Sequence, residues 1–573
     1  MQPLYDPRLG DVESDASSPK KRSLLALAGS LLAEISLPKL LAAWLLLIGL
    51  PALLLGAAPI AASMWFGGMF DSFVALQVEV WSAVVLVGLA GLALFFSRRL
   101  FRMAEHSFWS LNALAIQPLY AACREAMRQL VEKEFAPARA LAVLRAAAAA
   151  LAGLLISGAA LGVLVAIWPL TAWVGDLALL AAPGRLALAA VANSVAIVSL
   201  YVAGASLAWG LADAFMAQPR DLAAFDPQPE GAVWRIVHLS DLHAVGERYG
   251  FRIESGRAGP RGNERLREVF EKLEALHARE PLDAILITGD VTDAGLATEW
   301  AEFFDLLAQH PALAGLIAIT PGNHDLNIVD RANPARLDLP MSPIKRLRKL
   351  RVLAALDAVQ GGRACVVDAE RGLGQSLGAA LVPHQEAVVG FMDRGEPRLS
   401  PELNDLWTRT FPLVLAPESA QGLGFVLVNS NAETHFSFTN ALGMISLEQA
   451  RALDAVMAQY PDAFWVVALH HHVVEYPRPA KALSERIGTA LINGNWFVRR
   501  LQSCGDRVVV MHGHRHIDWI GECGALRIVS APSPVMAPDG APHFYVHRLA
   551  VGADRKLKLL QPERIDLGLA IAP

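Results

Sequence analysis

The stretch WRIVHLSDLH, residues Trp234 to His243, decides how the second half of this chain folds. It is a short apolar run with β-branched residues, which is typical of a buried strand, and an aspartate and a histidine follow at its end. Because side chains alternate along an extended chain, Asp241 and His243 point to the same side. One such pair is common in loops, so the argument depends on whether other strands end in the same way.

Composition divides the chain of 573 residues into two parts. Hydrophobic residues make up 54% of it and concentrate before residue 215, so a membrane part precedes a soluble part. The formal net charge of −5 gives no reason to expect a nucleic-acid partner. The four cysteines show no short paired spacing, which favours reduced thiols over a disulfide framework.

The membrane part contains apolar stretches long enough to cross a bilayer, which needs about 20 residues. The segment Ser23–Ile35 is too short, and we expect an interfacial or packed helix there. The spans hold few ionisable residues, and Asp213 falls just past the last of them, which favours an anchor over a transport path. The four predicted spans are Leu40–Met64, Val80–Phe96, Ala146–Trp168 and Leu186–Leu211.

Basic residues set the expected orientation. The connection between the second and third spans, Arg98 to Arg145, contains eight lysines and arginines, whereas residues 65–79 contain none. By the positive-inside rule, the N-terminus, this connection and everything after the fourth span are cytoplasmic. We therefore expect an integral membrane protein, of the inner membrane if bacterial, with a cytoplasmic catalytic part.

The soluble part alternates short apolar runs with amphipathic helical stretches, which predicts an α/β domain. The expected organisation is a membrane domain over 1–215, a linker over 216–231, a catalytic domain over 232–555 and a tail over 556–573. Helices are expected over 264–278, 298–307, 447–459 and 483–492. Strands are expected over 234–239, 284–287, 316–319, 425–428, 464–469, 507–511 and 526–529.

Five of these strands end in polar side chains that can bind a metal. In an open α/β sheet, ligands bind beyond the carboxyl ends of the strands. Each ending by itself is an ordinary turn more often than a ligand, but five together are not expected by chance. The endings are Asp241-Leu-His243, Asp290, Asn323-His324-Asp325, His470-His471-His472 and His512-Gly-His514-Arg-His516.

The order DLH, GD, GNHD, HHH, GHRH resembles the calcineurin-like metallophosphoesterase family over roughly residues 233–550. The resemblance implies a four-layered α/β/β/α sandwich with two metal ions at the sheet edge. It implies that His324 lies near the leaving group and that Asp290 bridges the metals. By the same resemblance, Asp241, His243, Asp290 and His516 would bind the first metal, and Asp290, Asn323, His470 and His514 the second.

Two points about this set stay open. His470 is preferred because it directly follows the strand, but His471 or His472 can serve as the ligand instead. Imidazole and carboxylate ligands without thiolate suit Mn, Fe, Zn, Ni or Co, and the sequence does not choose among them. Two such ions can bind phosphate oxygens and activate a water molecule, which predicts hydrolysis of a phosphoester or phosphoanhydride.

About a hundred residues after Asp325 match no motif, and one segment there bears on the substrate. The segment PIKRLRKLRVL, Pro343–Leu353, places leucine and isoleucine near one helical face and basic residues on the rest. Such a helix can lie on anionic lipid, or it can be an ordinary docked helix with a solvated charged face.

Three functions fit these observations. The first is a membrane-anchored phosphoesterase acting on a lipid phosphate or lipid-linked pyrophosphate. The second is an enzyme with a soluble substrate, such as a cyclic-nucleotide phosphodiesterase. The third is a regulatory membrane protein that uses the domain for binding, and the complete ligand set speaks against it. The expected partners are a phosphorylated substrate and the lipid bilayer; protein partners are not indicated.

Overall fold

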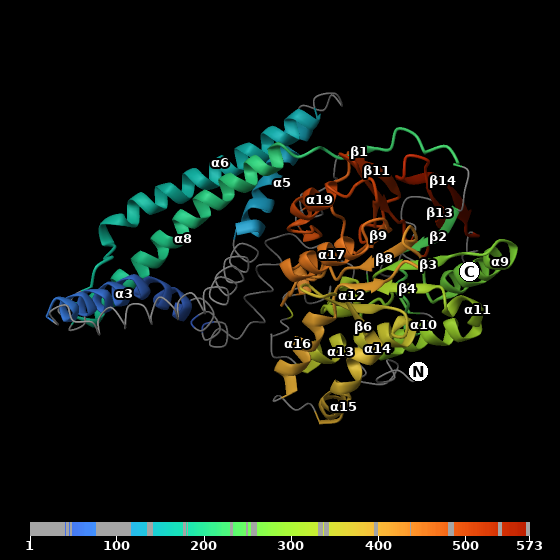
Figure 1. Ribbon diagram of the computed structural model, residues 1–573, viewed down its shortest axis with the longest axis horizontal. Coiled ribbons are helices and arrows are strands. Elements are labelled where there is room, and N and C mark those ends of the chain that lie inside the picture. Colours follow the sequence, from blue (N-terminus) through green and yellow to red (C-terminus); the bar gives the residue numbers. More distant parts are fainter. Residues whose placement is uncertain are drawn as a thin grey trace. The chain divides into compact units, whose positions relative to one another are not determined.

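The computed structural model divides into two compact units, one spanning residues 35–216 and the other containing residues 217–573 (Figure 1). Each is described by itself. The residues described are 41, 45, 49–75, 116–134, 141–175, 179, 182–229, 233–247, 250–253, 260–330, 336, 343–394, 399–435, 437–478, 486, 488–536 and 541–568.

The first unit is helical. Its described elements are α3 (Leu50–Ala75), α5 (Gln117–Glu134), α6 (Leu141–Ile167), the 3₁₀ turn η3 (Trp168–Leu170) and α8 (Pro183–Ala214). Three of these helices are long and apolar enough to cross a membrane: Leu50–Gly67 within α3, Leu141–Leu170 and Pro183–Ala214. They correspond to the first, third and fourth predicted spans. The second, Val80–Phe96, and the short segment Ser23–Ile35 lie outside the described residues.

Small residues bring the helices of this unit close together. A Cβ on Gly56 of α3 would overlap the carbonyl of Ala190 in α8, and a Cβ on Gly153 of α6 would lie 2.6 Å from the carbonyl of Ser206. Asn193 in α8 is fully buried, and its Nδ2 donates to the carbonyl oxygens of Gly56 (3.0 Å) and Ala172 (2.7 Å). Close backbone contact and interhelical hydrogen bonds are the usual means of packing helices in lipid.

Buried ion pairs attach α5 to the other helices, which corrects the expectation that charges lie outside the spans. Arg124 Nη1 lies 2.6 Å from Asp213 Oδ2, and Arg145 Nε lies 2.7 Å from Glu132 Oε1. α6 begins at Leu141 rather than Ala146, so Arg145 belongs to it, and Asp213 lies within α8. The hydropathy pattern missed these pairs because each joins residues far apart in the sequence.

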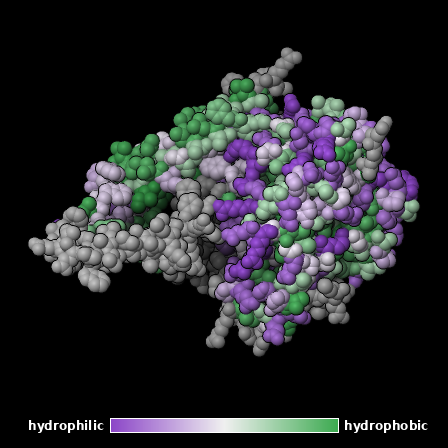
Figure 2. Space-filling view, in the orientation of Figure 1, coloured by the Kyte–Doolittle hydropathy of each residue, from purple (hydrophilic) through white to green (hydrophobic). Residues whose placement is uncertain are grey.

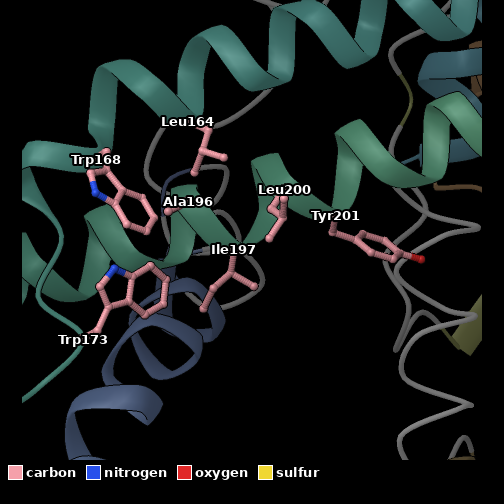
Figure 3. Close-up of a pocket in the computed structure, with 7 residues that line it drawn as sticks. All are labelled: Leu164, Trp168, Trp173, Ala196, Ile197, Leu200 and Tyr201. Atoms are coloured by element: carbon pink, nitrogen blue, oxygen red, sulfur yellow. The ribbon is translucent and has the colours of Figure 1, made fainter.

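An apolar pocket of about 420 Å³ lies along α6 and α8 (Figure 3). Trp168 and Trp173 stand close together at one end of the group, with ring centroids 5.8 Å apart, and Tyr201 lies at the other end. Figure 2 shows that the surface of these helices is largely hydrophobic, whereas hydrophilic and hydrophobic residues are mixed over the α/β unit. Both observations fit helices that lie in lipid.

The second unit contains two β-sheets that share one hydrophobic core. The five-stranded sheet has the order β14-β13-β2-β3-β4, from Leu557–Asp566, His543–Val551, Val233–Leu239, Ala284–Thr288 and Ile317–Thr320. The nine-stranded sheet has the order β1-β11-β12-β10-β9-β8-β7-β5-β6, from Arg220–Asp221, Trp519–Cys523, Leu526–Ser530, Val508–His512, Phe464–Ala468, Leu423–Leu427, Leu413–Leu415, Cys365–Asp368 and Gly372–Ser376. Trp234 of β2 and Phe464 of β9 contact each other between them.

All seven predicted strands are present within a residue or two of their expected ends. β2, β3 and β4 are parallel, and so are β8, β9, β10 and β12. The described helices are α9 (Glu264–Arg279), α10 (Ala297–Gln309), α11 (Pro311–Ala314), α12 (Asn323–Leu326), α13 (Pro343–Gln360), α14 (Leu377–Leu381), α15 (Gln385–Arg394), α16 (Ser400–Thr410), α17 (Leu447–Gln459) and α19 (Gly494–Gln502). The helix expected over 483–492 is only partly described: residues 486 and 488 are helical, and residues 489–492 are not, so the helix does not extend to its expected end.

Three expectations differ from the structure. The expected tail contains the ten-residue strand β14, which pairs with β13 at eight positions and belongs to the sheet, and the expected linker contains β1, which pairs with β11. Pro343–Leu353 is helical, as part of α13, but its basic side chains are buried rather than solvated or presented to lipid. Packing partners on other segments decide all three, and a local pattern does not contain them.

Replacing Asn193 with leucine should destabilise the helical unit. The change removes hydrogen bonds that join α8 to α3 and to the 171–175 segment, at a cost of about 1–3 kcal/mol. Thermal unfolding of the purified protein in detergent measures it. Leu188→Ala, at an exposed position of the same helix, is the matched control. An Asn193→Leu protein as stable as that control would contradict this role.

Candidate metal centre

The predicted ligands follow the carboxyl ends of strands from both sheets. Asp241 and His243 follow β2, Asp290 follows β3, and Asn323 follows β4 at the start of α12. From the other sheet, His470 follows β9, and His514 and His516 follow β10. The strands of each set are parallel neighbours, so their ends reach the same edge of the sheet. Every one of these side chains is buried or nearly so.

One group of ligand atoms is formed by Asp241, His243 and His516, which lie within 4.8 Å of one another. His516 Nε2 is 3.2 Å from Asp241 Oδ1. His243 Nε2 points toward Asp290 Oδ2, at 3.9 Å. This is the first predicted metal position, and its members come from both sheets.

A second group is formed by Asp290, His470 and His514. His470 Nε2 lies 3.2 Å from Asp290 Oδ2, 3.0 Å from Asn323 Oδ1 and 3.0 Å from His514 Nδ1. These are the four residues predicted for the second metal. Since Asp290 Oδ2 faces both His243 and His470, Asp290 stands between the two groups, where a bridging carboxylate must be.

The histidine triplet has one member directed at this centre. His470 Nδ1 lies 2.8 Å from the carbonyl oxygen of Thr288, which can only accept, so Nδ1 carries the hydrogen and Nε2 is left for a metal. His471 Nδ1 instead lies 2.9 Å from Ser430 Oγ, and His472 Nε2 lies 3.2 Å from Glu475 Oε1. The geometry therefore favours His470 among the three alternatives.

The backbone is strained at the ligands. Asp241, His243, Asp290, His514 and His516 all have positive φ, and among the described non-glycine residues only Arg555 shares this. Such conformations cost roughly 1–3 kcal/mol each and persist where surrounding structure enforces them. Gly322 shows the crowding, because a Cβ there would lie 2.1 Å from Asp290 Oδ1.

Two aspartates that the sequence did not assign hold the ligands in place. Asp293 Oδ1 lies 3.1 Å from His243 Nδ1, and Asp293 Oδ2 accepts a hydrogen bond from the Ile253 amide at 2.7 Å. Asp325 accepts from the amides of Gly322 (2.8 Å) and Thr292 (2.9 Å), which ties the two metal-site loops together. The signal for Asp293 was its position three residues after Asp290 in GDVTD.

His324 lies beside His243 and Asp293, with which it forms a further group of possible ligand atoms. Its amide donates to Asp290 Oδ1 at 2.8 Å, and its Nδ1 lies 2.6 Å from the carbonyl oxygen of Asp293. The ring lies edge to face against His243, with centroids 4.6 Å apart. Because the carbonyl oxygen can only accept, the hydrogen lies on Nδ1.

The charges of this cluster favour bound cations. Burial alone would raise the pKa of Asp241, but His516 beside it lowers that pKa to about 2. Burial would lower the pKa of His470, and the Asp290 carboxylate instead raises it to about 9. His243 Nε2 and His514 Nε2 are buried and have no hydrogen-bond partner among the described residues. Buried carboxylates with unpartnered imidazole nitrogens fit a metal site, where the metal replaces the protons.

Residues 235–415 match the family model for calcineurin-like phosphoesterases. This part of the chain is a calcineurin-like phosphoesterase domain. The match contains Asp241, His243, Asp290, Asn323 and His324, and the structure adds the three histidines that follow β9 and β10. No curated protein matches the sequence.

The chain is also similar to solved structures over somewhat more than half of its length. A dimetal phosphatase from Danio rerio is 12% identical, with 58% of this chain and 99% of that chain covered and a TM-score of 0.34. A putative 5'-nucleotidase from Staphylococcus aureus is 13% identical, with 58% and 54% covered and a TM-score of 0.29. The purple acid phosphatase PPD1 from yellow lupin is 12% identical, with 56% and 50% covered and a TM-score of 0.25.

Asp290→Asn should lower metal binding at both positions, because the one carboxylate faces both groups. Metal analysis of the purified protein after dialysis against a fixed free-metal concentration measures the content per chain. Asp462→Asn, at an exposed position after α17, is the control. Full metal content in the Asp290→Asn protein would refute the bridging role.

Asp293→Asn should weaken one metal position by about 10- to 100-fold, as expected when the partner of a metal-binding histidine is lost. The loss should concern the position of Asp241 and His243 and spare that of His470 and His514. Titration with a metal such as Co²⁺, followed by absorbance, separates a one-site from a two-site loss. Equal weakening of both positions would contradict this assignment.

Proposed function

We propose that this protein is a membrane-anchored phosphoesterase that uses two metal ions to hydrolyse a phosphoester or pyrophosphate bond with water. The observation that carries the proposal is the position of Asp290 between two groups of ligand atoms at one sheet edge. The proposal keeps the predicted ligands: Asp241, His243, Asp290 and His516 for one metal, and Asp290, Asn323, His470 and His514 for the other. It also keeps the α/β/β/α layer order expected for the family.

The residues present fit two ions of the Mn, Fe, Co, Ni or Zn type. When bound, such a pair supplies charge to hold phosphate oxygens and an activated water. The chain supplies the rest. Asp293 orients the His243 ring, and Thr288 orients the His470 ring through its carbonyl. These contacts hold the ligand nitrogens in place before substrate arrives, so little reorganisation is needed.

His324 is proposed to act on the leaving group. The Nδ1–H of His324 donates a hydrogen bond to the carbonyl of Asp293. In the protonated ring, Nε2–H is then the group proposed to meet the substrate. From there it can donate that proton to the departing oxygen, or hold the developing charge by a hydrogen bond. Both roles need the ring to stay where the Asp293 carbonyl and the His324 amide hold it.

The apolar helices of the first unit support the proposal that the substrate is a lipid in the bilayer. Three described helices of the first unit are long and apolar enough to span a membrane, and five residues separate the end of α8 from β1. If α8 spans, the phosphoesterase domain is held near that surface, which we propose is the cytoplasmic one. A lipid phosphate or a lipid-linked pyrophosphate is therefore the proposed substrate, ahead of a cyclic nucleotide.

Metal-loaded protein should hydrolyse at least one member of a panel of aryl phosphates, aryl phosphodiesters, cyclic nucleotides, nucleotides and detergent-solubilised lipid phosphates. Preference for lipid phosphates supports the proposed substrate, and preference for cyclic nucleotides replaces it with the soluble one. Absence of hydrolysis across the panel, with both metal positions filled, would leave the domain without this activity.

His324→Ala should lower kcat while metal content stays unchanged. A general acid typically contributes about 10²- to 10⁴-fold. The loss should be smaller for a p-nitrophenyl ester than for an alkyl ester, because the better leaving group needs less help from a proton. An equal loss on both esters would exclude protonation of the leaving group and leave charge stabilisation as the role.

A further inference from the structure

Two lysines of α13 are buried beside a single carboxylate. The side chains of Lys345 and Lys349 are only 6% and 8% exposed. Lys345 Nζ lies 3.2 Å from Glu433 Oε2, and Lys349 Nζ contacts Glu433 Oε1. Lysine is almost never buried without a partner. Here one carboxylate serves two ammonium groups, and the described residues thus place an excess of positive charge at this point.

Glu433, which supplies the carboxylate between the two lysines, lies at the surface. The side chain of Glu433 is 56% exposed, in contrast to the two lysines that it contacts. Burial alone would raise the pKa of Glu433, and the lysines instead lower it to about 2, so the group is ionised near neutral pH. An exposed anionic side chain thus occupies a site whose buried part is cationic.

The loop that carries Glu433 also carries contacts of the metal centre. It follows β8, and Ser430 Oγ accepts hydrogen bonds from the amides of His470 (3.2 Å) and His471 (3.1 Å). Asn431 Nδ2 donates to the carbonyl of Pro321 at 2.9 Å, two residues before the predicted ligand Asn323. Glu433 lies two residues further along.

The helix that carries the lysines contacts the metal centre from another side. α13 packs against α12, the short helix that contains Asn323 and His324. Arg351 Nη1 donates to the carbonyl of Gly295, which follows Asp293 by two residues, at 2.6 Å. The lysines and Glu433 therefore lie on two elements that both contact the metal-site loops.

We propose that Lys345 and Lys349 bind a second anionic group of the substrate, a phosphate other than the one that is hydrolysed. Glu433 occupies this subsite in the substrate-free protein and is displaced when the phosphate enters. The inference rests on the proposed function and names its substrate class: a phosphorylated compound with at least two phosphate groups, such as a pyrophosphate-linked one.

The chemistry of the subsite suits this ligand. Lysine is a common phosphate-binding residue, since its ammonium is a compact charge with three donors. His435 Nδ1 lies 3.4 Å from Lys345 Nζ and adds a further polar group at the same place. A phosphate carries more negative charge and more acceptors than Glu433, so it can satisfy both lysines better than the single carboxylate.

Binding of inorganic pyrophosphate by the full-length protein in detergent tests the subsite directly. Calorimetric titration is done on metal-loaded protein and on the same protein after chelation. Lys345→Met and Lys349→Met should each weaken binding to the chelated protein by about tenfold or more, the loss expected for one hydrogen bond to a charged group. Glu433→Gln should tighten it, because the competing carboxylate is gone.

The opposite expected changes in pyrophosphate binding, weaker in the lysine variants and tighter in Glu433→Gln, distinguish a binding site from a structural ion pair. If the three residues only hold α13 to the loop, all three changes lower the melting temperature and none tightens pyrophosphate binding. Unchanged binding in the lysine variants, or weaker binding in Glu433→Gln, overturns the inference. Lys558→Met, which breaks the surface pair with Asp554 on the β13–β14 hairpin, is the control and should change nothing.

Kinetics then link the subsite to the substrate. The lysine variants should raise KM for a nucleoside diphosphate about tenfold and lower kcat/KM on p-nitrophenyl phosphate, which has one phosphate, by clearly less. An equal loss on both substrates would overturn the assignment to a second phosphate. If no variant and no wild-type protein hydrolyses anything while the pyrophosphate pattern holds, the proposed function fails and the binding subsite stands.

Discussion

The buried carboxylate of Asp290 is the constraint on which the rest of the α/β unit depends. It is 2% exposed, and a buried charge is costly unless cations or donors surround it. His243 reaches it from one sheet, His470 reaches it from the other, and the His324 amide donates to it. These contacts bring the strand ends of both sheets together at Asp290.

The backbone strain lies in the ligands of this cluster. An extended chain places Asp241 and His243 on the same side but carries them onward along the strand direction. Positive φ at both residues, and again at His514 and His516, turns the chain just after β2 and β10, and all four side chains join the cluster there. Glycine at 322 leaves room for Asp290. The apolar strands determine the positions of the sheets, and the backbone strain is confined to these few ligand residues.

Local pattern predicted what is local. The strands and the polar residues at their ends were visible because each apolar run and the polar residues after it are adjacent in the sequence. Asp293 was missed because its partner His243 lies fifty residues earlier, and the pairing exists only once β2 and β3 lie side by side. The choice of metal ligand among His470, His471 and His472 was open for the same reason, since the carbonyl that orients His470 belongs to β3. In the helical unit, the Arg124–Asp213 pair joins residues 89 positions apart.

Helix α13 shows where an amphipathic pattern stops being informative. A stripe of leucines with basic residues around it is the pattern of a helix on anionic lipid, and equally of a helix whose charged side chains find partners inside the protein. In both cases the apolar stripe is buried, so hydrophobic spacing does not separate them; what separates them is whether anions of the chain meet the charges. The Glu433 carboxylate does so here, and the backbone carbonyls of Thr434 and Gly295 add neutral acceptors. The positive charge of this helix, for which the sequence left both alternatives open, therefore lies on an element that contacts the loops of the metal centre.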